Sequence, residues 1–184
     1  MTVLDDTLEI RERNRALAAV IGTAFGVGVS VGAVVPLLSL ILEQRGFDAT
    51  AIGINAAMFP LGAVGFSFLV PRLVAALGLF NAILASITLT AALMLLFPAT
   101  DDYFAWCAIR LAIGCVGVVH WIASETWINL LARDVNRSRV MAIYATVMAG
   151  GFVCGPLLLS WTGIAGWLPF FAVAAASLCA LVPV

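Results

Sequence analysis

The stretch YFAWCAIRLAIGCVGVVHWIASETWINLL, residues 103–131, decides how the whole chain is interpreted. Its strongly polar side chains are few, and Arg110, His120 and Glu125 stand alone among long apolar runs. A helix rises 1.5 Å per residue, so a segment of this length crosses a bilayer core of about 30 Å even when it is tilted. The stretch therefore predicts a membrane-spanning helix.

The composition of the rest of the chain extends this prediction. Of 184 residues, 64% are apolar and 10% charged, against roughly 45–50% and about 25% in soluble domains. A crossing with a short loop uses about 30 residues, so the length supports roughly six crossings. The formal net charge of -1 supplies no basic field, and no nucleic-acid partner is expected.

We predict an all-α membrane protein in which a cytoplasmic tail, residues 1–15, precedes a six-helix domain, residues 16–184. The first apolar run is too long for a secretory signal and remains a span. Pro71, Arg72 and Gly78 predict a short turn between the second and third spans. The six spans are 16–42, 51–70, 79–97, 103–131, 140–160 and 167–184.

Arginines are unevenly distributed between the two sides of this predicted topology. One side has Arg45 alone, and the other has Arg11, Arg13, Arg15, Arg72, Arg133, Arg137 and Arg139. Positive loops stay in the cytoplasm, which places the N-terminus inside. The sixth span ends at Val184 without a charged flank, so we expect an N-terminal piece of a longer protein, the alternative being a natural terminus at the membrane interface.

The four cysteines lie in apolar stretches without the close spacing of zinc or redox sites, so no metal and no cofactor is expected.

Glycines within the spans are concentrated in spans 1, 2, 4 and 5. The pairs Gly22/Gly26, Gly28/Gly32 and Gly151/Gly155 have the four-residue spacing of close helix contacts. With prolines at Pro36, Pro60 and Pro156, they predict that spans 1, 2, 4 and 5 are packed and mobile and that spans 3 and 6 face lipid in support.

The fourth span presents one polar or small face. At 100° per residue, Gly114, Gly117, Trp121 and Ser124 lie within about 40° of Arg110, and Glu125 lies about 60° from it. Arg110 and Glu125 are about 22 Å apart along the axis and cannot pair. A charge in the bilayer is costly, so this face is predicted to line a cavity or meet a partner.

Each polar group in this span has two open interpretations. Arg110 is a cavity charge that binds an anionic group or biases a titrating partner, or else it snorkels to the outer interface. Glu125 is a proton carrier or gate, or else it forms a cytoplasmic salt bridge with Arg72, Arg133 or Arg139. His120 is a packed neutral imidazole or a group that transfers protons.

Three local patterns resemble the major facilitator superfamily of secondary transporters. Arg110-Leu-Ala-Ile-Gly114 is similar to its fourth-helix motif, and Gly151-Phe-Val-Cys-Gly155-Pro156 resembles its antiporter-associated fifth-helix motif. The stretch 124–144 resembles a less characterised branch. The resemblance implies a 3+3 inverted-repeat half in which helices 1 and 4 line the cavity, helices 2 and 5 contact a C-terminal six-helix half, and helices 3 and 6 lie outside.

The resemblance implies the N-terminal half of a proton-coupled transporter of a small molecule in a bacterial inner (plasma) membrane. Efflux is favoured by the fifth-helix pattern, and the transporter is not expected to be an enzyme. One alternative is a degenerate or self-pairing six-helix scaffold. Another is an intramembrane hydrolase that uses Ser124 and His120, which are four residues apart on one helix.

Overall fold

The computed structural model describes residues 3–132, 134–179 and 181, and within these ranges the chain is helical without a β-strand. The helices follow one another in the order α1 (Val3–Gln44), α2 (Ala49–Ser67), α3 (Val70–Leu77), α4 (Leu79–Met94), the short 3-10 helix η1 (Phe97–Ala99), α5 (Tyr103–Leu131), α6 (Arg137–Thr162) and α7 (Leu168–Cys179).

The all-α membrane fold predicted from the sequence is confirmed. Five of the described helices are long and apolar enough to cross a membrane, and α7 is a shorter apolar helix of 12 residues. The segment predicted as the fourth span is α5 from end to end. Part of the predicted sixth span, residues 180 and 182–184, lies outside the described residues.

The structure departs from the predicted boundaries in two places. The predicted turn around Pro71 is wrong, because residues 70–77 form the helix α3, with this proline in its first turn. Proline is tolerated there because the first helical N–H groups have no intrahelical acceptor. Gly78 then separates α3 from α4 at a φ of 78°. In addition, α1 is already helical at Val3, so the segment predicted as a tail continues the first helix.

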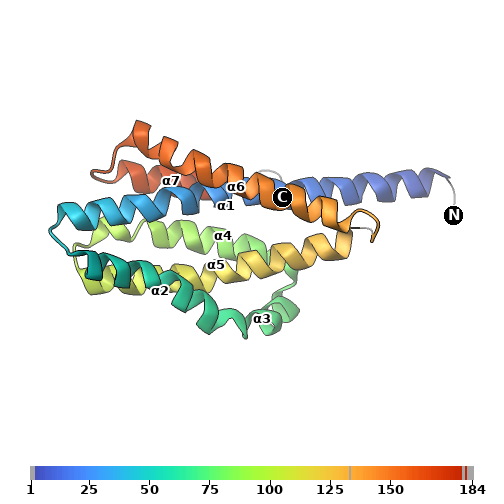
Figure 1. The fold of residues 1–184 in the computed structure, drawn as a ribbon. Helices are drawn as coiled ribbons and strands as arrows, with labels where there is room; N and C mark the ends of the chain where they lie inside the picture. The colour runs from blue at the N-terminus through green and yellow to red at the C-terminus, as the bar shows by residue number, and fades with distance from the viewer. Residues whose placement is uncertain (1–2, 133, 180, 182–184) are drawn as a thin grey trace.

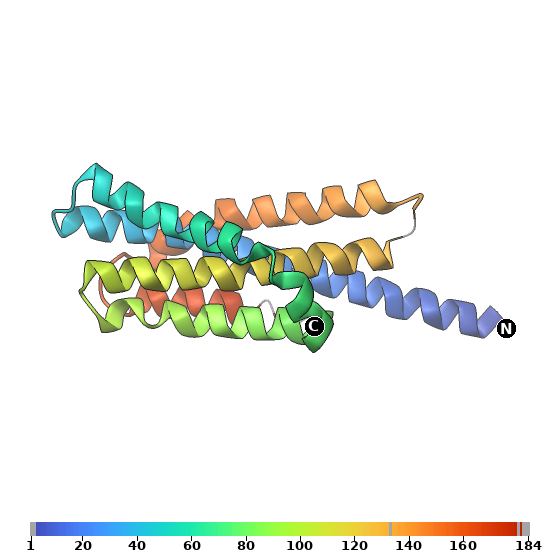
Figure 2. The ribbon, with the colours of Figure 1, turned by 90° about the horizontal axis from the view of Figure 1, so that it is seen from below.

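The long helices run roughly side by side in an elongated bundle (Figure 1). The connections α1–α2, α4–α5 and α6–α7 gather at one end, and α3 and the α5–α6 connection lie at the other. The N-terminal part of α1 projects beyond the bundle at that second end, which Figure 2 also shows from below. The arginine distribution predicts this second end to be cytoplasmic.

The helix contacts follow a twofold pattern between the triplet α1, α2 and α4 and the triplet α5, α6 and α7. Helix α1 packs mainly on α6 and then α7, and α5 packs mainly on α2 and then α4. The first helix of each triplet therefore contacts the second helix of the other. Two further contacts, α4 with α7 and α1 with α5, join equivalent helices across the pattern.

Glycines make the two largest helix contacts possible. On α6, a Cβ at Gly151 would lie 2.9 Å from the backbone nitrogen of Val29 and 3.0 Å from the Cα of Gly28, both in α1. On α2, a Cβ at Gly62 would lie 3.1 Å from the backbone nitrogen of Cys115 in α5. Two backbones approach this closely only where no side chain intervenes, so the predicted packing of spans 1, 2, 4 and 5 is confirmed.

The structure adds detail to the prediction that spans 3 and 6 face lipid and support the bundle. Helices α4 and α7 pack on each other as well as on α5 and α1. The most apolar window of α4 is 33% buried, whereas that of α2 is only 11% buried. The least buried of the long helices are therefore α2 and α6, because each buries mainly a glycine-containing face against one neighbour.

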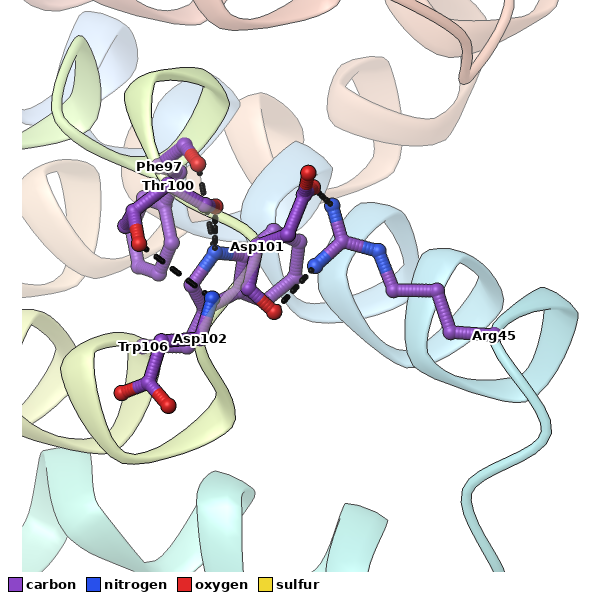
Figure 3. Close-up of polar contacts among 6 residues, drawn as sticks. All are labelled: Arg45, Phe97, Thr100, Asp101, Asp102 and Trp106. Atoms are coloured by element: carbon purple, nitrogen blue, oxygen red, sulfur yellow. Dashed lines mark hydrogen bonds and ion pairs between the residues drawn. The ribbon is translucent and has the colours of Figure 1, made fainter.

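The end of the bundle that holds the α1–α2 connection is closed by Arg45 (Figure 3). Its guanidinium forms an ion pair of 2.7 Å with the carboxylate of Asp101 and lies 4.3 Å above the ring centroid of Trp106. The indole N–H of Trp106 donates to the carbonyls of Thr100, at 2.9 Å, and Phe97, at 3.2 Å. Arg45, the one loop arginine that the predicted topology places on the outer side, thus joins the end of α1 to the start of α5.

Candidate functional site

The candidate site begins where α2 and α5 are fixed next to each other. Asp48 caps α2 by accepting a hydrogen bond from the backbone N–H of Ala51, and Asp102 caps α5 by accepting one from Ala105. Such caps satisfy backbone donors that have no partner inside the helix. The hydroxyl of Tyr103 donates to the carbonyl of Ala51 at 2.8 Å. The two caps fix where each helix begins, and the bond from Tyr103 to Ala51 joins the beginnings of the two helices.

Arg110 lies two turns further along α5 and is buried, with 5% of its surface exposed. Its Nη1 donates to the side-chain oxygen of Asn55 on α2 at 3.1 Å. The amide nitrogen of Asn55, which is fully buried, lies 3.5 Å from the sulfur of Cys107. Of the two interpretations of Arg110, the snorkelling one does not match the structure, because the guanidinium turns inward to a neutral amide.

Arg110 also lines a pocket of about 330 Å³. The pocket lies among α1, α2, α4, α5 and α7, and its other lining side chains are almost all apolar. They include Val31, Val34, Phe59 and Ile113. Known ligand sites are similarly apolar cavities of about 300–1,000 Å³ with a few placed polar groups.

A second pocket of about 160 Å³ adjoins the first, because Ser30, Phe59 and Ile113 line both. His120 lines this second pocket and is buried. Neither ring nitrogen of His120, nor the hydroxyl of Ser124, has a hydrogen-bond partner among the described residues. The Ser–His hydrogen bond that a hydrolase would need is therefore not formed in the part of the chain that the structure describes.

The two glycines predicted on the polar face have different surroundings. A Cβ at Gly114 would lie 2.9 Å from the carbonyl carbon of Phe59 and 3.1 Å from the nitrogen of Ala63, so Gly114 serves the packing of α5 on α2. Gly117 lines the smaller pocket, and a Cβ there would lie 3.6 Å from the ring of Phe59, an ordinary contact distance. The predicted face therefore divides into a packing part and a pocket part.

Trp121 and Glu125 lie together near the opposite end of α5. The indole N–H of Trp121, which is 44% exposed, donates to the carboxylate of Glu125 at 2.7 Å. Arg72 and Arg139 are exposed, and neither forms an ion pair with Glu125 in the described ranges. The third predicted partner, Arg133, lies outside the described residues. The structure thus gives Glu125 a neutral indole donor in place of the predicted arginines.

The fifth-span pattern lies on α6. Gly151 and Gly155 are buried against α1, where Gly28 and Gly32 face them. Pro156 is exposed, and α6 continues through it to Thr162 without interruption. These residues therefore bring α1 and α6 together and do not line the pocket of Arg110.

Sequence reasoning missed two groups in this region. Asn55 is an amide inside an apolar span, a signal that marks a buried hydrogen-bond partner in lipid. The hydroxyls of Ser30 on α1 and Ser177 on α7 are 2.8 Å apart and line both pockets. No spacing in the sequence connects residues that are 147 positions apart.

A comparison with families of known proteins now identifies the architecture. The model of the Major Facilitator Superfamily matches residues 3–184. The chain belongs to this superfamily. Its pattern of helix contacts is that of one six-helix half, in agreement with the fold expected from the resemblance.

A bacterial relative supports the same assignment. The chain is 26% identical over 143 residues to a protein described as an uncharacterized MFS-type transporter, YfkF, of Bacillus subtilis (strain 168). The match covers 78% of this chain and 37% of the relative. The chain is thus an integral, multi-pass membrane protein of a transporter superfamily, and it spans well under half the length of this relative.

Proposed function

We propose that this chain is the N-terminal half of a secondary active transporter that moves a small molecule by alternating access, coupled to protons and in the direction of efflux. The observation that supports it best is the buried Arg110 beside an apolar pocket inside a six-helix bundle of the major facilitator superfamily. In such transporters the binding site lies near the bilayer midplane, between the two halves that rock against each other.

Two features support the division of roles in this proposal. The exposed, apolar faces of α2 and α6 are where a C-terminal six-helix half would pack. Arg110, with Gly117 and Trp121, lies along the face of α5 that borders the pockets, and Glu125 stands at the predicted cytoplasmic end as a proton carrier or gate. The bacterial relative supports a location in a bacterial inner (plasma) membrane.

The experiment is proton-coupled flux in proteoliposomes that contain the full-length protein. A pH gradient is imposed, an internal pH dye is followed, and three apolar probes are added in turn, one cationic, one neutral and one anionic. We expect at least one probe to collapse the gradient, and we expect Arg110→Gln to abolish that response. Arg45→Gln, whose arginine lies at the outer end and away from both pockets, is the matched control.

The other outcomes bear on the alternatives. Flux that does not depend on the pH gradient would refute proton coupling but would still support transport. If the folded protein moved none of the probes and formed stable oligomers of this chain, the self-pairing scaffold would replace the proposal. Flux that everted vesicles show more strongly than right-side-out vesicles would support efflux.

A further inference from the structure

The environment of Arg110 is unbalanced in charge. A guanidinium has five N–H donors, and among the described residues only Asn55 accepts a hydrogen bond from it. Asn55 is neutral, so it orients the guanidinium without cancelling the charge. The ion pairs in the described ranges join Arg45 to Asp101 and Arg137 to Asp134, and neither involves Arg110.

The carboxylates along α5 do not restore the balance. The N-cap Asp102 lies eight residues before Arg110, about 12 Å along the axis, and is bound by the backbone N–H of Ala105. Glu125 lies 15 residues beyond Arg110 along α5, which corresponds to about 22 Å, and its carboxylate is bound by Trp121. Three hydroxyl groups share the larger pocket, and none of them supplies a counter-charge: those of Ser30 and Ser177 bond to each other at 2.8 Å, and that of Thr90 is neutral. A buried positive charge thus faces a pocket whose remaining walls are almost entirely apolar.

We propose that this pocket binds an organic monoanion with an apolar body, whose carboxylate or equivalent group contacts Arg110. This inference rests on the proposed function and names its substrate class. One guanidinium supplies one positive charge and a planar fork of donors, which fits a carboxylate in a bidentate geometry. A multiply charged or fully polar anion would leave charge against apolar walls, at a high desolvation cost.

The walls define the other end of the ligand. Val34, Phe59 and Met94 come from three different helices and surround the pocket with side chains that offer no hydrogen bonds. Beyond the shared residues the smaller pocket extends toward His120, so an apolar body can reach past Phe59 in that direction. The ligand would lie with its anion at Arg110 and its apolar end toward the middle of α5.

Asn55 provides an isosteric test of this arrangement. Asn55→Asp keeps the oxygen that Arg110 contacts at 3.1 Å and places a carboxylate there, so the protein itself supplies the counter-ion. The second carboxylate oxygen meets the thiol of Cys107, which can donate a weak hydrogen bond. Arg110 stays in place, but its positive charge is no longer available to a ligand.

The experiment compares 1-naphthoate with 1-naphthamide, which share a ring system and differ in charge. Binding is measured by equilibrium dialysis against the full-length protein in nanodiscs, with empty nanodiscs as the lipid blank. We expect the naphthoate to bind at least tenfold more tightly than the amide, a difference of about 1.4 kcal/mol. Asn55→Asp and Arg110→Gln should each bring the ratio close to one, and Arg45→Gln should leave it unchanged.

Several results would overturn the inference. Equal affinities in the wild type, no saturable naphthoate binding by folded protein, or a preference that survives both Asn55→Asp and Arg110→Gln would each do so. If an acidic residue from another part of the protein already neutralised Arg110, the wild type would bind 1-naphthoate and 1-naphthamide with equal affinities. Flux of cationic or neutral probes alone would refute this inference and preserve the proposed transport function. Naphthoate binding without flux of any probe would preserve this inference and refute the proposed transport function.

Discussion

Gly151→Ala, compared with Gly150→Ala, tests how closely α1 and α6 must approach. The two glycines are neighbours on α6, so the change in helix propensity is the same, about 0.5–1 kcal/mol in favour of alanine. A Cβ at Gly150 would meet nothing within 4 Å, whereas one at Gly151 would meet the Cα of Gly28 at 3.0 Å and the backbone nitrogen of Val29 at 2.9 Å. Ordinary contacts between such atoms need about 3.5–4.0 Å.

The difference between the two variants therefore isolates the steric cost. Overpacking by one methyl group costs about 1–3 kcal/mol, and the upper half of this range is expected because a backbone has no rotamer to change. We expect Gly150→Ala to be neutral or stabilising and Gly151→Ala to lie at least about 2 kcal/mol below it. The unfolding free energy is measured by titration with sodium dodecyl sulfate in mixed micelles, followed by circular dichroism. Equal stabilities would refute the close contact between α1 and α6.

Three further predictions concern other contacts. Gly62→Ala should destabilise the protein by about 1–3 kcal/mol relative to Gly65→Ala in the same assay, because Gly62 meets the backbone of α5 and Gly65 meets nothing within 4 Å; equal values would contradict the α2–α5 contact. Trp121→Phe removes the hydrogen-bond donor to Glu125 and should lower the free energy of unfolding by about 0.5–1.5 kcal/mol. The change Trp161→Phe, at a side chain 85% exposed, should have no effect, and an equal loss in both variants would show that the indole bond contributes nothing. Asp101→Asn should cost less than about 1 kcal/mol and less still in high salt, because the Asp101 side chain is 95% exposed; a larger, salt-independent loss would contradict a solvent-screened ion pair.

The membrane fold was predictable from the sequence because its signals are local. Apolar length predicts a span, and the four-residue glycine spacing predicts a close helix contact, so α5 and the packing faces of α1 and α6 followed from short stretches. The helix α3 was missed because a proline near a glycine is typical of a turn, although a proline in the first helical turn is equally compatible with a helix. The arrangement of α4 against α7 was missed because no local pattern encodes which apolar face meets which.

The sequence indicated the charges of the candidate site more clearly than their partners. It singled out Arg110 and Glu125 because a charge inside an apolar span is conspicuous. Asn55, the neutral partner of Arg110, was missed, and Trp121 was placed on the same face as Glu125 but was not recognised as its hydrogen-bond donor. The arginines of the predicted cytoplasmic side suggested a salt bridge to Glu125. In the structure its carboxylate instead accepts a hydrogen bond from the indole of Trp121, four residues away on the same helix.

This choice of neutral partners has a physical consequence for transport. A salt bridge inside the membrane would fix Arg110 and cancel its charge, so an incoming anion would have to replace an opposite charge before it could bind. The amide of Asn55 fixes the position of the guanidinium but leaves its charge uncancelled, and the indole of Trp121 does the same for Glu125. Both charges are thereby held in place on α5, about 22 Å apart, and remain available to a ligand, a proton or another part of the protein. In the proposed transport cycle this arrangement would favour binding and release of the cargo, because no internal ion pair would have to be broken when the cargo enters.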